Sequence, residues 1–250
     1  MQANKMSIPS EYDWCINEIK RYNYRIDVLA EIGSRDGLDA IKVSNSVNSN
    51  INLIFEADPE LIDSIKKNIQ NYGNSKNFDL FNLAIGDRDG EVDFYSVNKS
   101  TYPNEGVGSL FKIDFNNRNQ DDPDYKRLDV QKKIKISQNK YISLGLPAPD
   151  LLLIDVEGAE YNVLKGFEEE LSKVKFIVLE SSISKNHIGA ETFLTIYKLL
   201  KKNFKLIKNS RYEKNYKLFI DSYKYKIFRS KMYSPSFDLL FVNKSLTNLS

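Results

Sequence analysis

The stretch Asp150-Leu-Leu-Leu-Ile-Asp155-Val-Glu157-Gly-Ala-Glu160 decides the fold. Its apolar run Leu151–Ile154 has the length of a strand, and a strand over Leu151–Val156 with apolar side chains on both faces is typical of a buried parallel sheet. Carboxyl groups follow this strand, and Gly158 indicates a tight turn that brings them to a site. The alternative is that they stabilise the first turn of a helix expected over Tyr161–Leu171.

Strand-like and helix-like segments alternate on both sides of this stretch. The expected strands are Ile26–Ile32, Asn52–Phe55, Phe78–Ile85, Glu91–Val97, Lys133–Ile136, Leu151–Val156, Phe176–Glu180, Lys205–Lys208 and Leu239–Asn243. The expected helices are 10–22 with Ser10 as its cap, one that starts at Asp58-Pro59-Glu60, Tyr161–Leu171 and Ala190–Lys202. This alternation predicts an α/β domain with a mainly parallel sheet, in which ligands bind at the carboxyl ends of the strands.

Length and composition fit one soluble domain. With 250 residues we expect a single domain over 1–250, with an N-terminal helix at 10–22, a core at 26–244 and a loop insertion at 99–129. The net charge of +2 gives no global reason to expect nucleic acid or an anionic membrane, and no apolar run reaches the ~18 residues that span a bilayer. Cys15 is the only cysteine and no signal peptide is visible, so the expected location is the cytoplasm.

A glycine loop and a spaced acidic residue indicate a bound nucleoside. The loop Glu31-Ile-Gly33-Ser34-Arg35-Asp36-Gly37 follows the first strand, and Gly33 allows a ligand to approach the backbone. Arg35 stands where the dinucleotide fingerprint needs its second glycine, so the loop suits a ligand without a pyrophosphate. Glu56 ends the second strand 19 positions after Gly37, where a carboxylate can accept both ribose hydroxyls. Each signal alone has a structural alternative, namely a plain turn or a solvated carboxylate.

Several polar side chains are candidates for the chemistry. Asp155 and Glu157 could orient an acceptor or act as a base, and Glu160 shares their segment. The sequence does not indicate a metal site, although a strand-end carboxylate could bind a divalent cation together with Glu180. His187 is the only histidine and could accept a proton near neutral pH, while a lone histidine in a loop is more often solvated.

A basic stretch near the C-terminal end carries interleaved aromatic residues. Tyrosines and lysines alternate between Arg211 and Lys231, so bases or sugars could stack there and phosphates could pair with the lysines. The favoured interpretation is a basic, exposed edge hairpin whose lysines discourage association between sheets.

Motifs spread along most of the chain match those of a known family. They are Leu153-Ile-Asp155-Val-Glu157-Gly158-Ala-Glu160 with Val163-Leu-Lys-Gly166, Phe55-Glu56, Asn82-Leu-Ala84-Ile-Gly86-Asp87, Gly90, Phe94-Tyr95, Ser109-Leu110 and Leu239–Asn243. With these residues the chain resembles the FkbM family of methyltransferases from Val28 to Asn243. It departs from the family's usual Asp-x-Gly-Ala-Asn-x-Gly loop at Ser34 and Arg35, and it lacks the proline that usually follows the glutamate of the second strand.

The resemblance implies a Rossmann-like class I methyltransferase fold, with a seven-stranded, mostly parallel sheet, an antiparallel last strand and helices on both faces. It also implies S-adenosylmethionine as cofactor and S-adenosylhomocysteine as product. The cofactor site that it implies comprises Glu31, Gly33, Ser34, Gly37, Glu56, Ala57, Ala84, Ile85, Asp87 and Asp155.

We therefore expect methyl transfer to a hydroxyl of a sugar, a glycan or a related small molecule, with Asp155, Glu157 or His187 positioning or deprotonating the acceptor. One alternative is a nucleic-acid methyltransferase, which the Tyr/Lys stretch suggests although the charge does not favour it. A second is a non-catalytic domain that binds a partner through the 99–129 loop. A nicotinamide oxidoreductase comes last because of Arg35. The sequence leaves the oligomeric state open.

Overall fold

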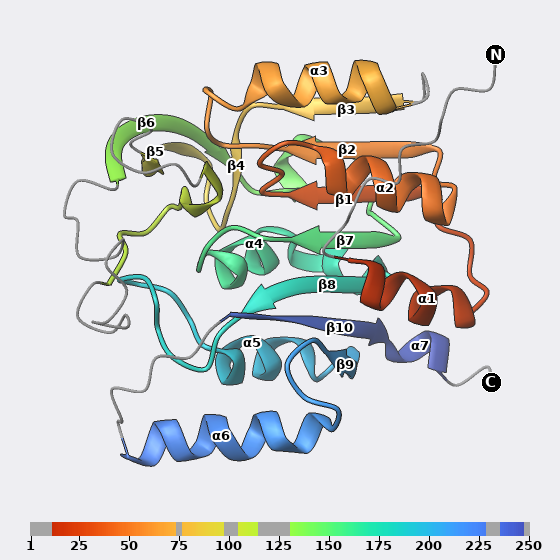
Figure 1. The fold of residues 1–250 in the computed structure, drawn as a ribbon, viewed down its shortest axis with the longest axis vertical. Helices are drawn as coiled ribbons and strands as arrows, with labels where there is room; N and C mark the ends of the chain where they lie inside the picture. Colours follow the sequence, from red (N-terminus) through yellow and green to blue (C-terminus); the bar gives the residue numbers. More distant parts are fainter. Residues whose placement is uncertain (1–11, 74–76, 98–104, 115–130, 229–235, 248–250) are drawn as a thin grey trace.

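The computed structural model describes residues 12–73, 77–97, 105–114, 131–228 and 236–247. A central sheet of seven strands crosses the molecule in the order β3-β2-β1-β7-β8-β10-β9, and only β10 runs antiparallel to its neighbours (Figure 1). These strands are β1 (Val28–Ile32), β2 (Ile51–Phe55), β3 (Asn77–Phe81), β7 (Leu151–Ile154), β8 (Phe176–Ser181), β9 (Phe204–Asn209) and β10 (Phe237–Asn243). The expected seven-stranded sheet with an antiparallel last strand is confirmed.

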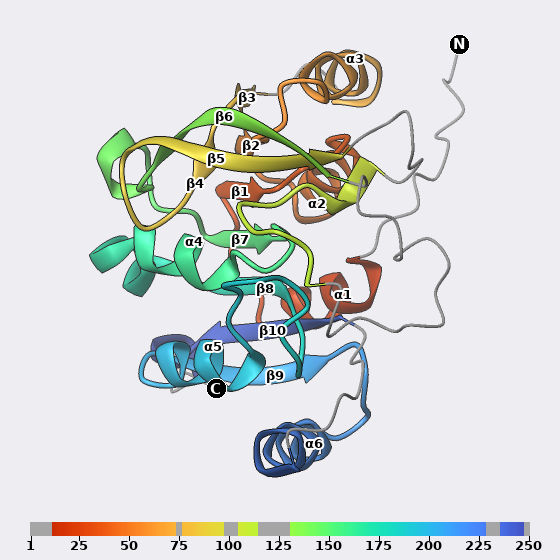
Figure 2. The same cartoon turned by 90° about the vertical axis from the view of Figure 1, so that its left-hand side faces the viewer.

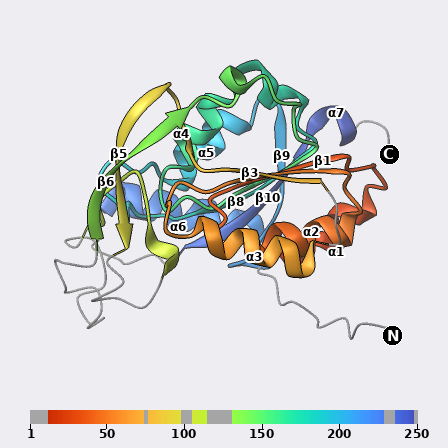
Figure 3. The ribbon, with the colours of Figure 1, turned by 90° about the horizontal axis from the view of Figure 1, so that it is seen from above.

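Helices cover both faces of this sheet. On one face lie α1 (Asp13–Arg21), α2 (Leu38–Val47) and α3 (Ile62–Tyr72), and on the other lie α4 (Glu160–Gly166) and α5 (Phe193–Leu200) (Figure 3). The helix α6 (Asn215–Phe228) packs against α5 and β9, and the short α7 (Lys244–Thr247) follows β10. None of the described helices is both long enough and apolar enough to cross a membrane.

The apolar runs form strands because burial on both faces rewards an unbroken series of apolar side chains. Along β7 alternate residues enter opposite cores: Leu152 and Ile154 pack with α4 and α5, while Leu151 and Leu153 pack with α1 and α2. The parallel register pairs Glu31 of β1 with Leu153 of β7, so both strands end at the same edge of the sheet. That edge is where the site lies.

A second sheet stands at this edge in the order β4-β6-β5, formed by β4 (Ala84–Ile85), β5 (Gly90–Val97) and β6 (Gln131–Asn139) (Figure 2). The expectation of one strand over Phe78–Ile85 was wrong, because the chain turns between β3 and β4. The Asn82 side-chain amide holds this turn by donating to the backbone carbonyl oxygens of Glu56, at 2.9 Å, and Ala57, at 3.3 Å. The strand expected at Lys133–Ile136 is longer and covers all of β6.

Three other expectations about secondary structure need correction. The segment Tyr161–Leu171 is two elements, α4 and the 3-10 helix η4 (Glu168–Lys173), because Glu168 has a φ of 48° and interrupts the α-helical geometry. The third helix begins at Ile62, since the Asp58 side chain caps a preceding turn by accepting from Glu60 N at 3.0 Å. The basic stretch after Arg211 forms the helix α6 and not an edge hairpin.

The expected cap and part of the expected loop insertion lie outside the residues that the structure describes. Ser10 and the segments 99–104 and 115–129 lie outside the described residues. Between those segments, the 3-10 helix η1 (Glu105–Val107) leads to Ser109, which pairs with Tyr95 of β5, and Ile113 pairs with His187. The described part of the loop therefore lies against both the second sheet and the segment after β8.

Candidate active site

A cleft opens where the carboxyl ends of β1, β2 and β7 face the second sheet. Its volume is about 870 Å³, including the part that opens to solvent. Glu31 and Gly33 follow β1 into it, Glu56 follows β2, and Asp155 and Glu157 follow β7. Ligands of open parallel sheets bind at this edge, beside the point where the strand order reverses, which here is between β1 and β7.

The glycine loop lies directly against the end of β7. Gly33 has a φ of 82°, and a Cβ atom placed on it would lie 1.8 Å from the backbone oxygen of Asp155. No side chain fits between these two strand ends, so only glycine allows the loop to lie this close to the end of β7. Gly37, with a φ of 77°, precedes α2, and a Cβ atom there would lie 3.0 Å from Ile65 Cγ2.

Glu56 organises the loop with its own side chain. Its Oε2 accepts hydrogen bonds from Ser34 N at 3.1 Å and Arg35 N at 2.9 Å, and its Oε1 accepts from Asp58 N at 2.7 Å. Burial raises the pKa of the Glu56 carboxyl, and the three backbone N–H groups oppose that shift. A carboxylate has about four lone-pair positions, so these three bonds leave one acceptor position on a residue that lines the cleft.

Glu31 is buried beneath the same loop. Its carboxylate accepts a hydrogen bond from the Ser34 hydroxyl. Burial raises the pKa of Glu31 well above its ordinary value, and the negative charge of nearby Asp39 adds to this rise. The floor of the cleft is therefore acidic and largely shielded from solvent.

The opposite wall of the cleft is apolar. Ala57, Ala84 and Ile85 line it, together with Phe94 of β5. Small and apolar side chains of this kind accommodate a flat aromatic ring, while the acidic floor accommodates polar and cationic groups.

Two residues of the expected cofactor site do not line the cleft. Asp87 forms an ion pair with Lys165 Nζ at 3.2 Å, and Gly37 turns the chain into α2. The other expected residues do line it, namely Glu31, Gly33, Ser34, Glu56, Ala57, Ala84, Ile85 and Asp155.

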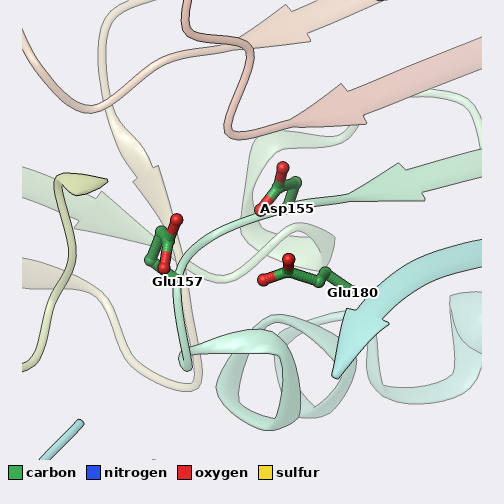
Figure 4. A group of neighbouring side chains, drawn as sticks. All are labelled: Asp155, Glu157 and Glu180. Atoms are coloured by element: carbon green, nitrogen blue, oxygen red, sulfur yellow. The ribbon is translucent and has the colours of Figure 1, made fainter. Parts of the chain in front are cut away.

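Three carboxylates converge at the ends of β7 and β8 (Figure 4). One carboxylate oxygen from each of Asp155, Glu157 and Glu180 lies within 4.8 Å of the others, and all three residues are partly buried. Burial raises the pKa of Glu180 far above its ordinary value, and the charges of Asp155 and Glu157 add to this rise. This set of oxygens could hold a hard divalent cation or a proton shared between the groups.

A smaller cavity adjoins the cleft, with a volume of about 310 Å³ that includes its part open to solvent, and Glu157 lines both. Its lining is mostly polar and includes Glu180, Ser182, Asn186 and His187. His187 is buried and not solvated, which differs from the ordinary expectation for a lone histidine in a loop. The structure thus brings together all three expected catalytic residues: Asp155 lies in the cleft, His187 in the smaller cavity, and Glu157 between them.

The turn that presents Glu157 is tightly held. Glu157 has a φ of 53°, Gly158 has a φ of 102°, and the Glu157 carbonyl oxygen accepts from the Ser109 hydroxyl at 2.8 Å. Glu160 is buried and accepts from Gly158 N at 2.9 Å. The alternative of a structural role in the turn before α4 therefore describes Glu160.

Sequence reasoning missed several residues of the cleft. Tyr12, Asp39, Leu61 and Phe94 line it without belonging to any motif at a strand end. Tyr12 is buried beside α1, and burial raises the pKa of its phenol well above the ordinary value. The Phe94-Tyr95 motif could have pointed to Phe94, whereas no local signal marks Tyr12, which enters through tertiary packing alone.

Comparisons with known proteins agree with this geometry. The model of the family described as "Methyltransferase FkbM domain" matches residues 27–212. A curated relative, 2-O-methyltransferase NoeI of Sinorhizobium fredii (strain NBRC 101917 / NGR234), is 28% identical over 181 residues, which cover 69% of this chain and 70% of the relative.

Solved structures of methyltransferases are also similar. Methyltransferase FkbM from Methylobacillus flagellatus KT has 12% identity and a TM-score of 0.49, with 86% of this chain and 43% of that chain covered. The chain therefore spans less than half the length of that protein. TrmK of M. capricolum, in complex with S-adenosylhomocysteine, has 10% identity and a TM-score of 0.44, with 93% of this chain and 68% of that chain covered.

The family match covers the glycine loop, Glu56 and the Asp155–Glu160 turn in one continuous span. The matched family is one of methyltransferases, which differs from both the nicotinamide oxidoreductase and the non-catalytic domain that the sequence left as alternatives. The chain belongs to the FkbM family of S-adenosylmethionine-dependent methyltransferases.

Proposed function

We propose that this protein transfers the methyl group of S-adenosylmethionine to a hydroxyl of a sugar, a glycan or a related small molecule. The observation that carries the proposal is the place of Glu157, which lines both the 870 Å³ cleft and the adjoining 310 Å³ cavity. A cofactor in the larger space and an acceptor in the smaller one would meet at this carboxylate.

The residues of the cleft fit the cofactor. Gly33 and Ser34, which line the cleft, would hold its methionine end, and Glu56 would accept the ribose hydroxyls. Ala57, Ala84 and Ile85 would contact the adenine, while Asp155 would lie towards the reacting end. When bound, the cofactor supplies an electrophilic methyl group on a cationic sulfur, and the acidic floor of the cleft favours such a cation.

The lining of the smaller cavity supports an acceptor rich in hydroxyl groups. Ser182, Asn186 and His187 offer hydrogen-bonding groups to this cavity, next to Glu157 and Glu180. A few placed polar groups fix the orientation of a small ligand. The printed name of the curated relative, a 2-O-methyltransferase, supports oxygen as the methylated atom.

Side chains of this protein would accept the proton of the acceptor hydroxyl. A sugar hydroxyl has a high pKa, so its oxygen becomes a good nucleophile only while a base accepts the proton. We assign this role first to the Glu157 carboxylate because it borders both spaces, with Asp155 and His187 as positioning groups. A divalent cation held by Asp155, Glu157 and Glu180 is the alternative way to stabilise the developing alkoxide.

A calorimetric titration with S-adenosylhomocysteine tests the cofactor site. Wild type should bind with micromolar affinity, and Glu56→Ala should bind roughly 10-fold more weakly or worse. The variant loses the proposed ribose contact and three backbone hydrogen bonds, two of which come from the glycine loop. Asp87→Ala is the matched control, since Asp87 does not line the cleft, and its affinity should stay within about twofold of wild type.

The acceptor is tested with Glu157→Gln and a panel of sugars, nucleotide sugars and glycans. This variant should keep its affinity for S-adenosylhomocysteine and lose methyl transfer by about 10²-fold or more, with activity measured with and without EDTA. No binding of S-adenosylhomocysteine by wild type would overturn the enzyme assignment. Methylation of RNA, with none of the hydroxyl acceptors modified, would overturn the acceptor class.

A further inference from the structure

The helix α6 carries an apolar stripe that faces away from the protein. Tyr216, Ile220, Tyr223 and Ile227 are 59%, 46%, 52% and 70% exposed. Their spacings of four, three and four residues place all four side chains on one face of the helix. Four large apolar side chains in one exposed row are unusual on the surface of a soluble monomer and mark an interaction site.

This stripe plays no part in holding α6 to the protein. The opposite face does that, since Leu218 is fully buried in the main core and Phe219 and Tyr225 pack against the same core. Phe219 also makes edge contacts with the rings of Phe193 and Tyr197 of α5. Seen along its axis in Figure 2, α6 lies at the periphery of the molecule, and only one side of it contacts the body.

The charges that flank the stripe are predominantly positive. Within α6, Lys217, Lys224 and Lys226 are exposed at positions next to the stripe. The acidic residue of the helix, Asp221, is partly buried and accepts a hydrogen bond from the Tyr212 hydroxyl. A partner that binds this face must therefore offer an apolar surface to the stripe and negative charge to the lysines beside it.

We propose that α6 docks this protein on an anionic lipid surface. Lysines beside an apolar row attract acidic headgroups, isoleucines enter the boundary with the acyl chains, and tyrosines lie at the level of the headgroups. A second copy of the chain fits less well, because pairing two such helices would bring their lysines together. Single-stranded RNA would use the tyrosines and lysines but leave the isoleucines without a partner.

Sedimentation of the full chain with vesicles tests this surface. Wild type should bind vesicles of phosphatidylcholine with 30% phosphatidylglycerol at about 0.1 M salt, bind pure phosphatidylcholine far less, and be released by about 0.5 M salt. Ile220→Ser with Ile227→Ser should abolish binding, and serine has a helix propensity close to that of isoleucine. Lys217→Gln with Lys224→Gln should weaken binding on the order of 30-fold.

Two matched controls distinguish binding through this face of α6 from a general effect of net charge or surface hydrophobicity. Lys66→Gln with Lys67→Gln removes the same charge from α3 and should bind as wild type does. Leu199→Ser removes an exposed apolar side chain from α5 and should also bind normally. Circular dichroism of every variant confirms that the helix content is kept.

Each contrary result overturns the proposal. Equal binding to both kinds of vesicle, no binding by wild type, or equal loss in the α3 controls would remove the basis for an anionic lipid surface. A dimer in sedimentation velocity that the isoleucine pair dissociates, without vesicle binding, would assign the face to a second copy. Salt-sensitive binding of single-stranded RNA alone would assign it to nucleic acid.

Discussion

The contribution of Glu180 to the free energy of unfolding depends on pH. It lies beside Asp155 and Glu157 at the edge of the sheet, and both burial and those charges raise its pKa. An ionised Glu180 therefore destabilises the folded protein relative to the unfolded chain, where a glutamate titrates near pH 4.3. Below that pH the group is protonated in both states and carries no penalty, and the penalty grows as the pH rises towards the raised pKa of the folded state.

The sign of this linkage gives a stability prediction for Glu180→Gln. Glutamine keeps the shape and cannot ionise, so the variant should gain unfolding free energy over wild type, and more at pH 7.5 than at pH 5.5. The difference should grow by about 1.4 kcal/mol per pH unit for one proton. Urea unfolding in EDTA at both pH values measures it. An equal difference at the two pH values would contradict the raised pKa.

Single residues of the site were predictable where a motif ties them to a strand end. Gly33, Glu56 and Asp155 follow apolar strands, and parallel strands bring their carboxyl ends to one edge. Tyr12 and the burial of His187 were not predictable, because both depend on segments that pack together from distant parts of the chain.

At the scale of elements, the glycine loop packs so tightly against the end of β7 that no additional atom fits between them. Gly33→Ala should lower the unfolding free energy by roughly 3 kcal/mol or more, because it adds a left-handed strain of about 1–2 kcal/mol and a clash with the Asp155 backbone. Gly145→Ala is the control, with a φ of 63° and nothing within 4 Å of the added Cβ. This control should lose only the unfolding free energy that corresponds to the left-handed strain, and denaturant unfolding of both variants measures the difference. Equal losses in the two variants would show that the contact has no cost.

Elements with a strong period or a continuous apolar run were predicted well, and irregular ones were not. β1, β2, β7 and β8 lie within a few residues of their expected bounds because burial on both faces leaves a clear pattern. α6 was missed because it has apolar residues on both faces, which hides a helical period. β4 was merged with β3 because two residues of strand show no period of their own.

At the scale of the whole molecule, one sheet supports two cores and the site. The α4 and α5 face and the α1 and α2 face share the strands β1, β7 and β8, whose alternate residues belong to one core or the other. Neither core can lose its packing without exposing the shared strands. The cleft lies at the end of the same strands, so we expect binding at the proposed cofactor site to stabilise both cores.

We propose that the chain unfolds as a single domain and that its cofactor product stabilises all of it. Fluorescence of Trp14, which packs on the α1 face, should change at the same urea concentration as far-UV circular dichroism. S-adenosylhomocysteine at 100 times its Kd should raise the unfolding free energy by about 2.7 kcal/mol. Glu56→Ala at the same concentration, with 10-fold weaker binding, should gain only about 1.4 kcal/mol. A tryptophan transition that separates from the circular dichroism would instead show that the α1 face unfolds independently of the rest.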